Sequence, residues 1–156
     1  MKINIVGTLI DRYSFDEVVE MTIDRALTGT SPTYIVTPNS QHINNLQHDS
    51  LFRKIYRQAF LAIPDGMSII WAAKFLKTPL TEKISGSNLL EKLCERGASK
   101  PLRIFFLGGR PEAADRAAEI LERRYPGLKI AGTHCPPVGF EHDPAEINLI
   151  DRKILS

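Results

Sequence analysis

Two short stretches organise this sequence: residues 34–39, Tyr-Ile-Val-Thr-Pro-Asn, and residues 61–66, Leu-Ala-Ile-Pro-Asp-Gly. Each contains a continuous apolar run, which is typical of a strand buried on both faces of a parallel sheet. Each run ends at a proline, which lacks the N–H needed to continue strand pairing. The residues next to the two prolines, Thr37, Asn39 and Asp65, therefore lie at the carboxyl edge of the sheet. Open α/β folds bind their ligands at this edge, so we predict that these three residues mark the active site.

Strands and helices alternate along the chain. Residues 2–11 alternate weakly and predict two short strands or a small hairpin, and a capping box at Ser14 and Glu17 begins a helix that ends at Gly29. Similar signals predict helices at 40–48, from 49 or 50 to about 60, at 67–76, at 87–96, at 111–124 and after 143, and strands at 102–107 and 128–133. The helix at 67–76 is apolar around most of its surface, and we expect burial on most sides.

This alternation predicts an α/β fold built from right-handed βαβ crossovers. A mostly parallel sheet would carry helices on both faces, in a single domain over residues 1–156. The last helix, after Asp143, has an apolar stripe but leads into no further strand. We therefore expect the domain to be incomplete at its C-terminal end.

Composition narrows the function classes. The chain has 156 residues, 43% of them hydrophobic, and a formal net charge of +2, which suggests a soluble globular protein without a nucleic-acid partner. Cys94 and Cys135 form neither metal spacing nor a disulfide framework, which suits the cytoplasm. The four histidines also lack metal spacing, and we expect them on the surface or in loops, with no metal and no cofactor. No apolar run approaches the roughly 20 residues of a membrane span, so any membrane contact would be peripheral.

Asp65 has two interpretations that the sequence leaves open. An Asp between a strand and a helix is a good N-cap, worth about 1 kcal/mol. The same position suits a catalytic base, because a cap interaction and the helix dipole both favour the ionised carboxylate. A carboxylate of this kind would accept a proton as the attacking hydroxyl becomes acidic in the transition state. The two roles are compatible.

The other candidate residues have similar alternatives. Thr37 and Asn39 could donate to a phosphate or a sugar hydroxyl, or they could form a polar turn that caps the next helix. Gly108 and Gly109, between a strand and a helix, would let backbone N–H groups approach a phosphate. They lack the third glycine of a dinucleotide-binding motif, so a plain tight turn is the simpler interpretation.

Five stretches, in this order and at this spacing, resemble the WecG/TagA/CpsF family of bacterial glycosyltransferases. They are Ile-Val-Thr-Pro-Asn at 35–39, Ile-Pro-Asp-Gly at 63–66, Glu-Lys-Ile-Ser-Gly-Ser-Asn-Leu at 82–89, Ile-Phe-Phe-Leu-Gly-Gly at 104–109, and Tyr-Pro-Gly-Leu-Lys-Ile-Ala-Gly-Thr at 125–133. The resemblance covers the chain from Ile5 to Glu146. It implies a Rossmann-like fold and an inverting, metal-independent transfer from a UDP-sugar to a polyprenyl-diphosphate-linked sugar. The family acts at the cytoplasmic membrane face, in the synthesis of teichoic acid, common antigen, capsule or exopolysaccharide.

The resemblance also implies roles for individual residues. Asp65 matches the family's proposed general base, and Thr37 and Asn39 match polar residues of its active site. The matching stretches add four expected substrate-binding residues, namely Gly66, Lys83, Gly108 and Gly109. The family commonly has Arg at position 83 and Asp at position 88, where this chain has Lys and Asn. A lysine keeps the charge but loses the bidentate fork of arginine.

Family members are longer than this chain and carry a second half with further glycine-rich and basic segments. We therefore expect residues 1–156 to be the N-terminal part of such an enzyme and to be poorly active alone. A sheet edge left open would favour a homo-oligomer. The alternative function is a non-catalytic α/β module that binds a nucleotide, a phosphosugar or a partner chain.

Overall fold

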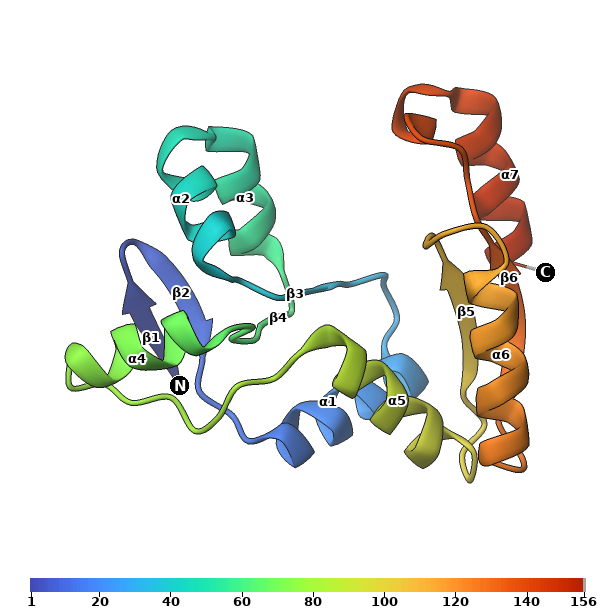
Figure 1. Ribbon diagram of the computed structural model, residues 1–156, viewed down its shortest axis with the longest axis horizontal. Helices are drawn as coiled ribbons and strands as arrows, with labels where there is room; N and C mark the ends of the chain where they lie inside the picture. The colour runs from blue at the N-terminus through green and yellow to red at the C-terminus, as the bar shows by residue number, and fades with distance from the viewer. Residues whose placement is uncertain (156) are drawn as a thin grey trace. The chain divides into compact units, whose positions relative to one another are not determined.

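The structure is a computed structural model that describes residues 1–155. Its contacts group into two compact units, Met1–Leu90 and Glu91–Ser156. Each unit has a core of its own. The α-helices and strands of both units are labelled in Figure 1.

The first unit opens with an antiparallel hairpin of β1 (Lys2–Ile5) and β2 (Thr8–Asp11), as the sequence predicts. Its two-residue turn places Val6 at φ +47° and Gly7 at φ +78°. The Oδ1 atom of Asn4 accepts a hydrogen bond from the Gly7 N–H at 2.7 Å. Two positive φ angles match the twist of a hairpin turn, but Val6 is β-branched and is strained in this conformation.

Helices and two short parallel strands complete the first unit. After α1 (Phe15–Thr28), which begins with the predicted capping box, come β3 (Ile35–Val36), α2 (Ser40–His48), α3 (Ser50–Gln58), β4 (Leu61–Ala62) and α4 (Met67–Phe75). Strands β3 and β4 pair in parallel, with Ile35 opposite Leu61. The helices α2 and α3 form the crossover between them. The parallel pairing of the two proline-ended strands is therefore confirmed.

A core of aliphatic side chains lies between the hairpin and the helices α2 and α4. It contains Ile3, Ile5, Ile10, Ile43, Ile69, Ala73 and Leu80. The carboxylate of Asp11 is also buried, and it accepts a hydrogen bond from the Ala62 N–H at 2.9 Å. Lys2 Nζ lies 3.2 Å from the same carboxylate. Asp11 thus connects the hairpin to β4 at Ala62, two residues before Pro64.

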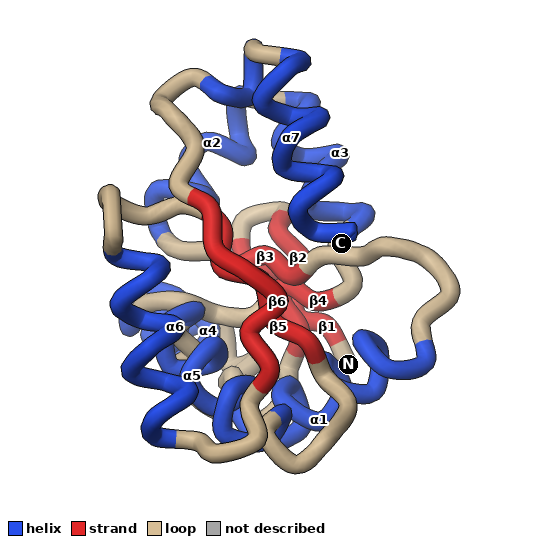
Figure 2. Tube along the Cα trace, turned by 90° about the vertical axis from the view of Figure 1, so that its right-hand side faces the viewer, coloured by secondary structure: helices blue, strands red, loops and turns tan. Residues whose placement is uncertain are grey.

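The second unit contains a second parallel pair. Helix α5 (Gly86–Gly97) leads into it, followed by β5 (Arg103–Leu107), α6 (Ala113–Arg124), β6 (Lys129–His134), the 3-10 turn η1 (Phe140–His142) and α7 (Pro144–Leu155). Figure 2 shows β5 and β6 side by side in red. Helix α6 packs on both strands and α7 packs on β6. Cys94, Phe106, Ala118 and Leu128 form the core of this unit.

The predicted α/β class is confirmed, and the strands within residues 1–155 are grouped in three two-stranded sheets, two of them parallel. The expected burial of α4 is wrong. Ile69 and Ala73 are buried, but Trp71 is 65% exposed and Phe75 is 87% exposed. The helix packs on the hairpin through one side only, because no other element of the first unit covers its outer side.

Candidate active site

The carboxyl ends of β3 and β4 lie side by side. Beyond the paired strands, the Ile63 N–H donates to the Val36 carbonyl, and the Asp65 N–H donates to the Pro38 carbonyl, both at 2.9 Å. Parallel pairing thus continues to Asp65. It fixes this residue beside the Thr-Pro-Asn turn, as the sequence predicts.

Asp65 carries a carboxylate without a partner. Its residue is half-buried, and within residues 1–155 its side chain forms no hydrogen bond and no ion pair. The N-cap of α4 is Gly66, and no side chain caps this helix. The cap interpretation of Asp65 is therefore wrong, because the extra residue Gly66 moves Asp65 outside the first turn. The carboxylate is free to accept a proton.

Gly66 has a conformational role. Its φ of +127° and ψ of +143° belong to a region that only glycine adopts readily. A Cβ at this position would find space, since its nearest neighbour would be Ser68 Oγ at 3.7 Å. The backbone angle, rather than crowding, is therefore what demands glycine here. A contact between Gly66 and substrate stays a prediction.

Asn39 and Thr37 differ in whether their side chains form hydrogen bonds within the chain. The Oδ1 atom of Asn39 caps α2 by accepting from the His42 N–H at 2.9 Å. His42 is held in turn by Tyr56, whose hydroxyl lies 2.6 Å from His42 Nδ1. Burial raises the pKa of Tyr56 to about 12, so this hydroxyl stays protonated at neutral pH. The Asn39 cap is confirmed. Because the cap uses only the Oδ1 atom, the NH2 group of the same side chain can still donate hydrogen bonds.

The hydroxyl of Thr37, in contrast, has no hydrogen-bond partner in the part of the chain that the structure describes. Thr37 is half-buried and lies between β3 and the start of α5. A Cβ built on Gly86 would come within 3.9 Å of the Thr37 Cγ2 atom. Thr37 therefore faces the beginning of α5 with an unused hydroxyl group.

The segment that precedes α5 completes this edge. The Ile84 N–H donates to the Pro64 carbonyl at 2.8 Å, so residues 83–86 run beside the residues that precede Asp65. Ser85 Oγ accepts from the Asn88 N–H at 3.4 Å, at the start of α5. The exposed ammonium group of Lys83 has no ion pair among the described residues. Thr37, Asn39, Asp65 and the Lys83 segment thus meet at one edge of the first unit.

Gly108 and Gly109 belong to the second unit, where they follow β5. Both have positive φ, +94° and +93°, which explains why glycine occupies both positions. The Gly108 N–H donates to the His134 carbonyl at 2.8 Å, and the Gly109 carbonyl accepts from Cys135 Sγ at 3.3 Å. The tight-turn interpretation is therefore realised. Binding of a phosphate by these residues stays a prediction.

A cluster of polar side chains in the second unit was missed from the sequence. His134 Nε2 lies 2.6 Å from Glu146 Oε1, and Lys153 Nζ lies 3.0 Å from His134 Nδ1. An ammonium can only donate, so Nδ1 accepts, and the Nε2–H donates to the carboxylate. His134 is the last residue of β6 and is half-buried, so our expectation that the histidines lie on the surface or in loops is wrong for this one. Glu146 and Lys153 lie seven residues apart on one face of α7, which is the signal that could have indicated the pair.

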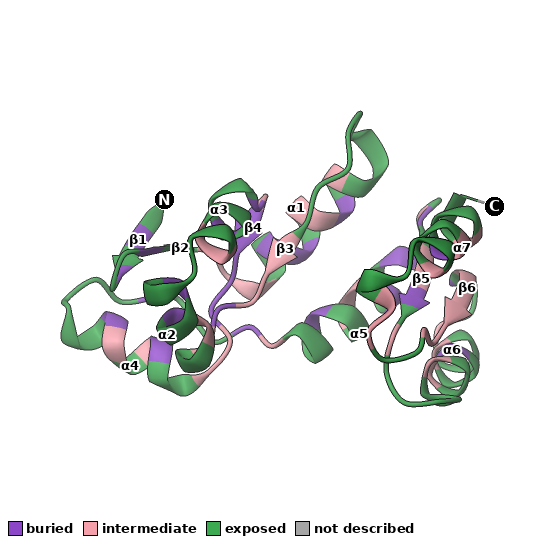
Figure 3. Cartoon of the chain, turned by 90° about the horizontal axis from the view of Figure 1, so that it is seen from above, coloured by how far each residue is buried: buried purple, intermediate pink, exposed green. Residues whose placement is uncertain are grey.

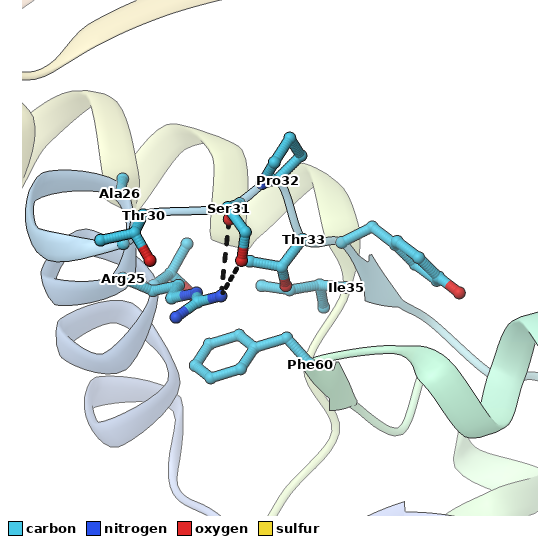
Figure 4. A pocket seen from close by; sticks show the side chains of 11 residues that line it. Arg25, Ala26, Thr30, Ser31, Pro32, Thr33, Ile35 and Phe60 are labelled. Atoms are coloured by element: carbon cyan, nitrogen blue, oxygen red, sulfur yellow. Dashed lines mark hydrogen bonds between the residues drawn. The ribbon is translucent and has the colours of Figure 1, made fainter.

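A cavity of about 580 Å³ lies at the opposite end of β3. It is lined by the last turns of α1, the loop that follows α1, Ile35 at the start of β3, and Phe60, which precedes β4 (Figure 4). The Arg25 guanidinium lies over the Phe60 ring, 5.7 Å from its centroid, and donates to Ser31. None of the predicted site residues lines this cavity. We therefore place the candidate chemistry at the carboxyl edge, which has an unpaired carboxylate, hydroxyl and ammonium group.

Such a set can accept a proton and bind an anionic, hydroxyl-rich ligand. In the comparisons with known proteins, the model of the "Glycosyl transferase WecG/TagA/CpsF family" matches residues 3–154. N-acetylglucosaminyldiphosphoundecaprenol N-acetyl-beta-D-mannosaminyltransferases of Staphylococcus aureus, from strains NCTC 8325 and COL among others, are 27% identical over 134 residues. The match covers 85% of this chain and 53% of each relative. The chain thus spans about half the length of the curated relatives it matches.

Proposed function

Because the chain belongs to the WecG/TagA/CpsF glycosyl transferase family, we propose that it carries the acceptor-activating part of an inverting glycosyltransferase. The donor is a UDP-sugar, and the acceptor is a sugar linked to a polyprenyl diphosphate. The acceptor class is supported by the name of the S. aureus relatives, which transfer to a diphosphoundecaprenol-linked sugar. The products belong to the synthesis of cell-surface polysaccharides.

Asp65 is the general base in this proposal. The acceptor hydroxyl oxygen forms a bond to the anomeric carbon of the donor sugar, while the bond from that carbon to UDP breaks. UDP leaves with the electron pair, and the hydroxyl proton passes to the Asp65 carboxylate. One observation carries the assignment. The Asp65 carboxylate has no partner within residues 1–155, although its backbone is held in place by the Pro38 carbonyl at 2.9 Å. A base needs both a fixed position and a free oxygen atom.

The neighbouring residues would orient the substrates. The Thr37 hydroxyl and the Asn39 amide can hydrogen-bond sugar hydroxyls on either side of the base. The Lys83 ammonium supplies a positive charge for a phosphate oxygen, as a point charge rather than as a bidentate fork. The Gly66 N–H is a further candidate contact to the donor diphosphate. In the second unit, the Gly109 N–H is a candidate contact to a phosphate, whereas the Gly108 N–H already donates to the His134 carbonyl, so a role of Gly108 would be to shape the turn. UDP is a good leaving group, so the reaction needs a base and stabilisation of the diphosphate more than a strong acid.

In this proposal, the lipid-linked acceptor and the UDP-sugar donor meet at the cytoplasmic face of the cell membrane. No helix among residues 1–155 is long and apolar enough to cross a membrane. We propose that the contact with the membrane is peripheral.

The test is a pair of substitutions, Asp65→Asn and Asp65→Ala, in a protein that contains residues 1–155 and has measurable transfer activity. Both variants should lose turnover by about 10²–10⁴-fold and keep their affinity for the UDP-sugar. Donor binding is measured by calorimetry, and Asp49→Ala serves as the control because Asp49 only caps α3. If either Asp65 variant retained near-normal turnover, the assignment of the base would fail. If residues 1–155 are instead a non-catalytic α/β module, neither substitution should change the turnover of the protein that contains them.

A further inference from the structure

The outer side of α4 is an exposed apolar stripe. Met67, Trp71 and Phe75 follow one another at intervals of four residues, so they share one face of the helix. Their exposed fractions are 47%, 65% and 87%, and Leu76 at the end of the helix is 47% exposed. Figure 3 shows exposed turns of α4 beside its buried ones. Four large, exposed apolar side chains thus lie within ten residues, three of them on successive turns of one helix face.

Cations flank this α4 face, and acidic residues are absent from it. Between Asp65 and Glu82 the sequence contains Lys74 and Lys77 but no Asp or Glu. Both lysines are exposed, and neither ammonium group forms an ion pair in the described chain. The lysine stems can lie along apolar surface while their charged ends stay in water. The α4 face therefore combines apolar and aromatic side chains with an uncompensated positive charge.

We propose that the α4 face binds the surface of a bilayer that contains anionic lipids. Tryptophan and phenylalanine partition into the boundary between headgroups and acyl chains, and lysines next to them pair with anionic headgroups. The helix has nine residues and is about 14 Å long, so it is too short to span a bilayer and lies in the interfacial plane. A second copy of this chain would bring the same two lysines, Lys74 and Lys77, against each other, and this like-charge contact disfavours self-association through the α4 face.

This location would serve the reaction, and this step rests on the proposed function. Helix α4 begins at Met67, only two residues after Asp65. Two residues of extended chain span at most about 7 Å. A helix held in the headgroup layer would therefore keep the base close to the level of a lipid-linked diphosphate. The Asp65 carboxylate would then lie near an acceptor that stays in the membrane.

Trp71 is the single tryptophan of the chain, so tryptophan fluorescence reports on the α4 face alone. Its fluorescence is measured with vesicles of phosphatidylcholine alone and with vesicles in which a third of the lipid is phosphatidylglycerol. Co-sedimentation of the chain with the vesicles is measured in parallel. We expect a blue shift and sedimentation with the anionic vesicles only. Each lysine should contribute roughly a fivefold change in the partition coefficient, so the double variant Lys74→Ser/Lys77→Ser should bind about 25-fold more weakly.

Two further variants separate this face from general hydrophobicity. Phe75→Ser removes the most exposed ring of the stripe, keeps Trp71, and should weaken binding to anionic vesicles at least tenfold. The matched control is Leu51→Ser on α3, where the side chain is 66% exposed, and it should leave binding unchanged. Circular dichroism confirms that each variant is folded.

Three results would overturn the proposal. They are no blue shift with anionic vesicles, equal weakening by Leu51→Ser and Phe75→Ser, or a blue shift that appears without vesicles as the protein concentration rises. The last result would assign the α4 face to a second copy of the chain. Because vesicle binding is measured without turnover, failure here leaves the assignment of Asp65 intact, and failure of Asp65 leaves this one intact.

Discussion

Asp49 and Asp65 each precede a helix, but only one of them should matter for stability. The Oδ1 atom of Asp49 accepts from the Phe52 N–H at 2.8 Å and caps α3, whereas α4 begins at Gly66 without a side-chain cap. Replacing Asp49 by alanine removes a cap and should lower the free energy of unfolding by about 1 kcal/mol. Replacing Asp65 by alanine removes no hydrogen bond within the described chain. The expected change is therefore within about 0.5 kcal/mol.

Both residues lie in the first unit, so the two variants are compared in the same unfolding transition. The assay is urea denaturation followed by circular dichroism at neutral pH, with the midpoint and slope fitted for each variant. The slopes should agree, which would show that the unfolded states are alike. A loss of 1 kcal/mol or more for Asp65→Ala would mean that the carboxylate stabilises α4 after all. The carboxylate would then not be free for catalysis.

Three further predictions concern stability and thiol chemistry. Asp11→Ala should lower the free energy of unfolding, measured by urea denaturation, by about 3 kcal/mol, because it leaves the buried Ala62 N–H without its acceptor. Asp11→Asn should lower it less, since the amide Oδ1 can still accept this hydrogen bond. Equal losses for the two variants would contradict this prediction. A thiol reagent should modify Cys135 in the folded protein and should reach buried Cys94 only when the protein unfolds. Equal rates of modification of the two cysteines at neutral pH would contradict this prediction. Burial raises the pKa of Cys94 from 9.0 to about 11 and that of Tyr56 from 10.0 to about 12. The unfolded chain then binds fewer protons than the folded one between pH 9 and 12, so the free energy of unfolding should fall across this range, and a constant value would refute the burial.

The sequence predicted the edge of the site well because local rules determine it. A proline ends each strand, and parallel pairing places the two ends together, so the contact between Asp65 and Pro38 could be predicted from the chain alone. The prediction that Asp65 caps α4 was wrong by a single residue, because Gly66 is the N-cap of this helix. The φ of +127° at Gly66 shifts the start of α4, and no local pattern distinguishes a capping Asp from one that lies just outside the helix.

Features that depend on distant residues were not predictable in the same way. The apolar content of α4 indicated burial, but composition does not say which sides another element covers, and Trp71 and Phe75 remain exposed. The position of residues 83–86 beside Pro64 depends on contacts between distant segments, such as the backbone hydrogen bond from Ile84 to Pro64. The contact of His134 with Glu146 forms only because α7 packs on β6. The residues next to His134 and Glu146 in the sequence do not indicate this packing.

The claim that Asp65 removes the acceptor proton is tested most directly by changing the acidity of the acceptor hydroxyl. Transfer by the unmodified enzyme and by its Asp65→Asn variant is compared with an ordinary acceptor and with one whose hydroxyl is acidified by a neighbouring fluorine. A general base matters less when its proton is more acidic, so the rate ratio between the two enzymes should shrink with the fluorinated acceptor. A ratio that stays the same for both acceptors would show that Asp65 is not the base.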